Sequence, residues 1–162
     1  MAYASLLAGM AFGTAGTHLS HAIQYPVGAL THTPHGLGTG MMLPYTMQAI
    51  LPTDTKRLAE IAKALGVDTG SAEESAQAAI EEVAALMADI GLPLDLASMG
   101  VKESELPRIV ELSLTVRRLV ANSVVDPTEE NLERIVRAAF DGDRKALAPL
   151  TTGGLNEGET HK

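Results

Sequence analysis

The sequence predicts an all-α protein, a bundle of about six helices, on three observations. Aromatic residues make up only 3% of the 162 residues, so Ala, Leu, Val, Ile and Met must fill the core, which suits packing of helix on helix. Apolar residues recur at helical spacing in several segments. No segment alternates apolar and polar residues as a half-buried strand does. We assign residues 1–148 to one helical domain and the Gly- and Thr-rich residues 149–162 to a disordered tail.

Two helices are expected in the first third of the chain. Residues 2–29 are rich in Ala, Leu and Met and predict one long buried helix, which Pro26 kinks or ends. Thr33 is a favourable N-cap and Pro34 suits the first helical position. A second helix is therefore predicted over about 34–47.

Four further helices are expected, each with its own start signal. Thr53 or Asp54 caps the first of them, which ends before Gly66. Ser71 begins a capping box with Glu74 three residues later, and Asp126-Pro127-Thr128-Glu129 starts the last helix. The expected helices cover about 54–64, 72–90, 102–119 and 127–139. Their expected inward positions are Ala79, Val83, Leu86 and Ile90, then Ile109, Leu112, Val116 and Leu119, then Leu132, Ile135, Val136 and Ala139.

Composition excludes several classes of protein. A net charge of −8 argues against a nucleic-acid binder, which needs a basic surface. The absence of Cys rules out disulfides, thiolate metal sites and a Cys nucleophile. The N-terminus has no basic residue before its apolar run, so no secretory signal is expected and the predicted location is the cytoplasm.

Charge is distributed unevenly along the chain. Residues 1–53 contain no Asp, Glu, Lys or Arg, and all 32 charged residues (12 basic and 20 acidic) fall in residues 54–162. Gly, His and Pro interrupt the neutral segment too often for a membrane-spanning helix of ~20 apolar residues. We therefore expect no membrane contact and a segment surrounded by protein. Some of the protein that surrounds residues 1–53 is expected to come from further polypeptide, from a separate subunit, or from a second copy that forms a homo-oligomer through this segment.

Four of the five histidines lie in a stretch without charged residues, Gly16 to Gly40. A single His in such a place is most often a hydrogen-bonded core residue, but the clustering also suits a metal site. The 13 residues between His21 and His35 leave room for a helix end and a reversal. His35 is expected in the first turn of a helix, where the helix dipole disfavours the imidazolium ion and so favours the neutral form that a metal ligand needs. A divalent ion needs three or four donors, so spacing alone indicates half a site.

Other motifs are weak. The run Gly36–Gly40 invites comparison with a phosphate loop, but no strand precedes it and the Lys of a Walker motif is absent. Close helix packing is the better interpretation of these glycines.

The histidine stretch resembles the C-terminal helical domain of the iron-containing (group III) alcohol dehydrogenases, a partial dehydroquinate-synthase-like fold. That family carries a pattern similar to G-x-x-x-x-H-A-x-x-H-x-x-G-A-x-x-x-x-P-H-G, followed by L-P-[HY]-x-M. The matching residues here are Gly16, His21-Ala22, Gly28-Ala29, Pro34-His35-Gly36 and Leu43-Pro44-Tyr45-Thr46-Met47. "VVDPTEENLERIVRAAF" resembles the family's closing segment, so the resemblance covers about residues 2–140. The segment "HLSHAIQYPV" is most similar to the hydroxyacid–oxoacid transhydrogenase-like branch of this family.

The resemblance implies roles for individual residues. His21 and His35 would be two ligands of a catalytic Fe²⁺ or Zn²⁺. Tyr25 stands where many members have a second His; it would donate a hydrogen bond to a substrate oxygen or pass a proton, or be a hydroxyl at the pocket wall. His18 and His32 are assigned to the pocket wall or to structural roles.

The resemblance also implies what this sequence does not contain. The family supplies an Asp and a His four residues later as its other two ligands, and an N-terminal α/β domain that binds NAD(P). The implied function is the metal-site half of a metal-dependent NAD(P)-linked alcohol dehydrogenase, inactive as an isolated chain, which need not bind metal or nucleotide alone. Two alternatives stay open: a non-catalytic helical interaction or oligomerisation module, and a metalloprotein that completes its site with a second copy.

Overall fold

A computed structural model describes residues 1–147 and residue 150, and in these residues the fold is all-helical, as predicted. Leu150, from the predicted tail, is buried in the core, and the rest of residues 149–162 lies outside the described residues. The α-helices are α1 (Ala2–Ala15), α2 (Leu19–Thr31), α3 (His35–Ala64), α4 (Ala72–Asp89), α5 (Leu106–Thr115), α6 (Arg117–Val120) and α7 (Glu129–Asp141), and the 3-10 turns are η1 (Glu103–Glu105) and η2 (Arg144–Ala146).

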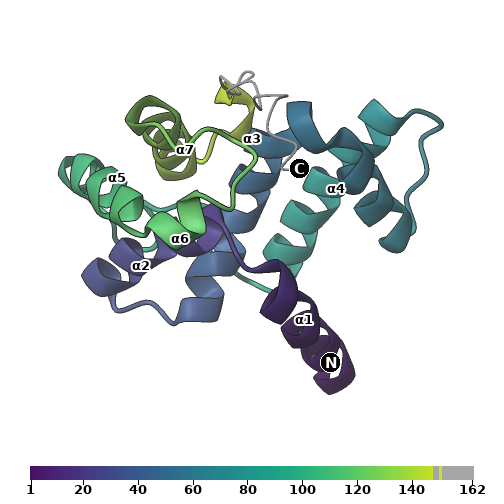
Figure 1. Ribbon diagram of the computed structural model, residues 1–162, viewed down its shortest axis with the longest axis horizontal. Coiled ribbons are helices and arrows are strands. Elements are labelled where there is room, and N and C mark those ends of the chain that lie inside the picture. Colours follow the sequence, from purple (N-terminus) through teal and green to yellow (C-terminus); the bar gives the residue numbers. More distant parts are fainter. Residues whose placement is uncertain (148–149, 151–162) are drawn as a thin grey trace, which may run out of the picture.

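The prediction of one long buried helix over residues 2–29 is wrong. The chain breaks into α1 and α2 at Gly16, whose backbone (φ 76°, ψ −178°) lies in a region that is essentially reserved for glycine. No residue of α1 is buried, and α1 projects from the rest of the molecule (Figure 1). Its apolar residues surround the helix instead of forming one stripe, so no single face directs it onto the core. Pro26 lies inside α2 and does not end it.

The two helices predicted over 34–47 and 54–64 are one kinked helix, α3. The kink is at Asp54, whose φ of −131° and ψ of 32° are not helical. Pro52 has no backbone N–H to donate to the preceding turn, which explains a bend at this place rather than a loop. The N-cap of α3 is Pro34 and not Thr33 as predicted. Thr33 instead shares a hydrogen bond with the hydroxyl of Thr31.

The start signals of α4 and α7 are confirmed. The Ser71 hydroxyl accepts a hydrogen bond from the Glu74 backbone N–H at 3.1 Å, and the Thr128 hydroxyl does the same for Asn131 at 3.2 Å. All four predicted inward residues of α7 are buried: Leu132, Ile135, Val136 and Ala139.

Other predicted inward positions are corrected. Leu86 of α4 and Ile90, which directly follows α4, are 53% and 64% exposed, because α4 packs on α3 through the earlier stripe that contains Ala79. The helix predicted over 102–119 consists of η1, α5 and α6, with a break at Val116 (φ −82°, ψ 57°). Ile109 and Leu119 are buried in these segments, and Leu112 and Val116 are half-buried.

Two apolar clusters hold the helices together. The larger one joins α2 and the first half of α3 to α5 and α7, with Ile23, Met42, Ile109 and Ile135 among its fully buried residues. The smaller one lies between the second half of α3 and α4. Figure 1 shows α4 beside α3, on the side of the molecule away from α5. Within the described residues, each helix is too short or too polar to cross a membrane.

Candidate metal centre

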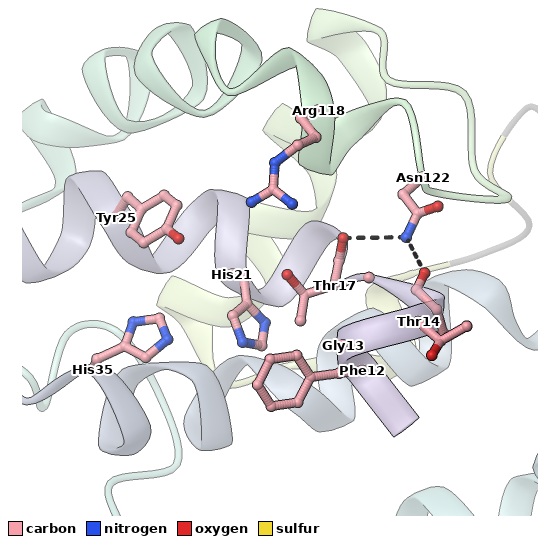
Figure 2. A pocket seen from close by; sticks show the side chains of 11 residues that line it. Phe12, Gly13, Thr14, Thr17, His21, Tyr25, His35, Arg118 and Asn122 are labelled. Carbon is pink, nitrogen blue, oxygen red and sulfur yellow. Dashed lines mark hydrogen bonds between the residues drawn. The ribbon is translucent and has the colours of Figure 1, made fainter. Parts of the chain in front are cut away.

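Helices α2 and α3 bring His21 and His35 together. His21 lies in the first turn of α2 and His35 is the first residue of α3, and residues 32–34 reverse the chain between the two helices. The ring centroids are 5.1 Å apart and the rings are inclined at 62°. Figure 2 shows the two side chains next to each other at one side of a pocket. The local fold therefore places two imidazoles at one point, as the spacing predicted.

Each imidazole contacts one polar side chain through its Nδ1. Nδ1 of His21 lies 3.3 Å from the hydroxyl of Ser20, and Nδ1 of His35 lies 3.0 Å from Oε1 of Gln24. With Nδ1 engaged in both rings, Nε2 is the nitrogen that each ring can offer to a ligand in the pocket.

The electrostatic surroundings favour a neutral His21. Burial lowers the pKa of His21 below its usual value, and the neighbouring His35 and His18 lower it further because two like charges repel. A neutral imidazole is the form that binds a metal ion.

The pocket has a volume of about 510 Å³. The break between α1 and α2 forms one wall, α2 and the start of α3 form another, and α6 with the following residues closes it (Figure 2). Tyr25 stacks on His35, with ring centroids 5.8 Å apart at 23°. Among the described residues that line this pocket, Arg118 is the one charged side chain. The lining residues are Phe12–Thr17, His21, Tyr25, His35, Arg118 and Asn122.

The structure separates the other two predicted histidines from this pair. His18 lies on the wall of a neighbouring cavity of about 270 Å³, together with Asp54 and Arg57. Its Nδ1 is buried without a hydrogen-bond partner in the described part of the chain, and burial lowers its pKa. His32 is exposed, follows α2 in the left-handed conformation (φ 55°) and is not among the residues that line the pocket.

The donor set fits part of a metal site. A metal–imidazole bond is ~2.1 Å long, so two imidazoles that share one tetrahedral ion have ring centres about 5 Å apart, which matches His21 and His35. In the described residues, no group of three or more His, Cys, Asp or Glu side chains is placed to hold a metal ion. The described part of the chain thus offers two donors where an ion needs at least three from protein.

Three residues near the site were missed by the sequence analysis. Gln24 lies one helical turn after His21, a spacing that was visible in the sequence. Arg118 and Asn122 lie about 100 residues further along the chain, where no local pattern in the sequence connects them with the histidines. Asn122 donates hydrogen bonds to the carbonyl oxygens of Ala15 (3.0 Å) and Thr17 (3.3 Å), which fixes the wall at the α1–α2 break (Figure 2).

Comparison with known proteins decides the family. The model of the Fe-containing alcohol dehydrogenase family, C-terminal, matches residues 1–140. The chain belongs to this family. It corresponds to the C-terminal part of an iron-containing alcohol dehydrogenase, as the His21…Pro34-His35-Gly36 pattern implied.

The relatives of this chain in the family are considerably longer. It is 38% identical over 144 residues to a long-chain-alcohol dehydrogenase 1 of Geobacillus thermodenitrificans, covering 88% of this chain and 36% of the relative. It is 37% identical over 142 residues to a 1,3-propanediol dehydrogenase of Citrobacter freundii, covering 86% of this chain and 36% of the relative. A solved 1,3-propanediol oxidoreductase structure matches with a TM-score of 0.77 and 36% identity, over 86% of this chain and 37% of that one. The chain thus spans about a third of the length of the relatives it matches.

Proposed function

We propose that this chain is the metal-site half of a metal-dependent, NAD(P)-linked alcohol dehydrogenase. His21 and His35 would supply two imidazole ligands, and the remaining ligands and the nucleotide site would come from polypeptide outside residues 1–162. The observation that carries the proposal is the pair of rings 5.1 Å apart at the mouth of a pocket, in a chain of the iron-containing family. The helical domain that would hold this pair is the one assigned from the sequence to residues 1–148.

The chemistry follows from the groups around the pocket. A bound Fe²⁺ or Zn²⁺ supplies Lewis-acid polarisation of a substrate oxygen. His21 and His35 would hold the ion through Nε2, because Nδ1 of each ring is already engaged by a neighbouring side chain. Tyr25 is half-exposed beside His35, where its hydroxyl can donate a hydrogen bond to a substrate oxygen or pass a proton. The pocket walls that this chain supplies position the substrate.

Two donors alone bind a divalent ion weakly and leave its geometry open, so we propose that the isolated chain does not turn over alcohols. The test is metal content and zinc affinity of the purified chain, together with a dehydrogenase assay with NAD(H), NADP(H) and added Fe²⁺ or Zn²⁺. We expect weak zinc binding that His21→Ala and His35→Ala each abolish. His32→Ala is the matched control, because His32 is exposed and lies outside the pocket lining.

Each outcome of this test decides a part of the proposal. Zinc affinity that is unchanged by His21→Ala contradicts the ligand assignment. Robust turnover by the chain alone contradicts the proposed dependence on further polypeptide. One metal ion for two chains, with dimers in a sizing measurement, favours a site that is completed by a second copy.

A second candidate function rests on helix α1. Tyr3, Leu6, Met10 and Phe12 are each more than half exposed on this helix, and it carries no charged residue. A surface of this kind is typical of an interaction site rather than of a free helix. We propose that α1 mediates association, with a second copy of this chain as its partner in solution.

A further inference from the structure

Gln24 is a buried polar side chain that touches the candidate metal centre without belonging to it. Its side chain is 3% exposed, and it lies on α2 one turn after His21. Oε1 of Gln24 reaches across to α3 and lies 3.0 Å from Nδ1 of His35. One helix therefore carries both the first candidate ligand and a contact to the second.

Two glycines make room for this amide. A Cβ added to Gly28 would lie 2.6 Å from Nε2 of Gln24, and one added to Gly38 would lie 2.6 Å from its Cγ. Distances under 3.0 Å are not found between real Cβ atoms and their neighbours. Gln24 therefore lies in a close-fitting slot between α2 and the first turn of α3, and a Cβ at either glycine would displace its side chain.

The direction of the hydrogen bond determines which nitrogen of His35 carries the proton. An amide oxygen only accepts, so Nδ1 of His35 must donate to it. In a neutral ring the proton is then on Nδ1, and Nε2 keeps its lone pair. Ligating histidines in metal sites are oriented by this type of contact from the second nitrogen to a carbonyl or carboxylate oxygen.

We propose that Gln24 is a positioning residue that fixes His35 in the Nδ1–H tautomer, with Nε2 unprotonated and turned toward the pocket. The use of that Nε2 as a metal ligand rests on the proposed function, whereas the tautomer itself does not. The stacking of Tyr25 on the ring of His35 supports the same orientation from the side of α2.

The test is NMR on the ¹⁵N-labelled chain with chelator present, at a pH where His35 is neutral. Long-range ¹H–¹⁵N spectra distinguish a protonated from an unprotonated ring nitrogen. We expect protonated Nδ1 and unprotonated Nε2 for His35, and a shift toward the Nε2–H tautomer in Gln24→Met, which keeps the length of the side chain and removes the amide. Gln48→Met is the matched control, because the Gln48 amide bonds to Gln77 of α4 and not to a histidine.

A zinc titration then separates this inference from the proposed function. We expect Gln24→Met to weaken zinc binding by about 10-fold or more, and Gln48→Met to leave it unchanged. An Nε2–H tautomer in the unsubstituted chain overturns the proposal. The NMR measurement on the unsubstituted chain can be made even if Gln24→Met does not fold. The predicted tautomer in a chain that binds no zinc contradicts the zinc binding expected of the isolated chain and supports the role of Gln24.

Discussion

The side-chain amide nitrogen of Asn122 lies 2.9 Å from the point where a Cβ at position 16 would stand. The same nitrogen donates to the carbonyl oxygens on both sides of Gly16, those of Ala15 and Thr17. The loop after α6 thus holds the break between α1 and α2, over a separation of more than 100 residues. This contact makes the wall of the pocket depend on a glycine.

Gly16→Ala is therefore expected to loosen α1 and the pocket wall. The substitution places a Cβ in a backbone conformation that is reserved for glycine, which costs about 1–3 kcal/mol. The new Cβ also clashes with the side chain of Asn122. Since no residue of α1 is buried, the effect should be local. Amide hydrogen exchange should become faster over residues 12–18, while the thermal midpoint of the main core changes little. Gly9→Ala is the control; it has open space for a Cβ and should slow exchange in α1.

Tyr25→Phe should separate binding from catalysis. The ring that stacks on His35 remains, so we expect the zinc affinity of the chain to stay within about twofold of the original. In an active complex with the polypeptide that supplies the nucleotide site, loss of the hydroxyl should lower kcat by about 10²-fold or more, with a smaller effect on KM. An unchanged kcat would assign the Tyr25 hydroxyl to the pocket wall only.

His18 should make the fold sensitive to acid. Burial lowers its pKa in the folded state, so below the usual value of ~6.5 the unfolded chain binds a proton that the folded chain resists. The stability from neutral His18 is thus present above that pH and is lost as the pH falls toward the lower folded pKa. His21 acts in the same direction. Urea unfolding as a function of pH should show this fall, with a smaller slope in His18→Gln. Equal slopes in the two chains would contradict the prediction.

His32→Gly should stabilise the protein. His32 follows α2 with a φ of 55°, a left-handed conformation that is unfavourable for residues other than glycine. The gain in the free energy of unfolding is expected to be up to about 1 kcal/mol. The reciprocal change, Gly142→Ala, places a Cβ at a φ of 71° after α7 and should cost about 1 kcal/mol. Chemical denaturation measures both, and a loss of stability in His32→Gly would refute the strain argument.

Leu6→Lys should weaken association through α1. Leu6 is 59% exposed on a helix without charged residues, and a lysine there must be desolvated in any apolar interface. Light scattering after size exclusion should show oligomers for the original chain and a shift to monomer for Leu6→Lys. Leu86→Lys, which adds the same charge at a similarly exposed leucine of α4, is the control. A monomeric original chain would contradict association through α1.

Features that depend on contacts within a few residues were predictable from the sequence. The hydroxyls of Ser71 and Thr128 cap helices by accepting hydrogen bonds from the backbone N–H three residues later. A segment of four residues is therefore enough to recognise each cap. The meeting of His21 and His35 was predictable because a short reversal joins two consecutive helices. The all-α fold followed from apolar spacing and from a low content of aromatic residues.

The missed features depend on distant residues. The break at Gly16 is held by hydrogen bonds from Asn122. Leu86 is exposed because the contacts of α4 with α3 in the smaller cluster do not extend to it. Thr53 and Asp54 indicated the start of a new helix, but the apolar contacts on both sides of the kink keep α3 continuous. The absence of charged residues predicts burial equally well for α1 and α2. Only the three-dimensional arrangement shows that α2 is buried and α1 is exposed.

The kink of α3 also separates two parts of the molecule that should differ in the free energy of local unfolding. Of the six buried residues of the smaller cluster that lie beyond Asp54 in α3 or in α4, four are alanines, namely Ala59, Ala62, Ala76 and Ala79. Small side chains bury little area, so this hairpin should form a separate foldon with a lower opening free energy than the main cluster. It could then unfold and refold on its own while His21 and His35, in helices of the main cluster, keep their places.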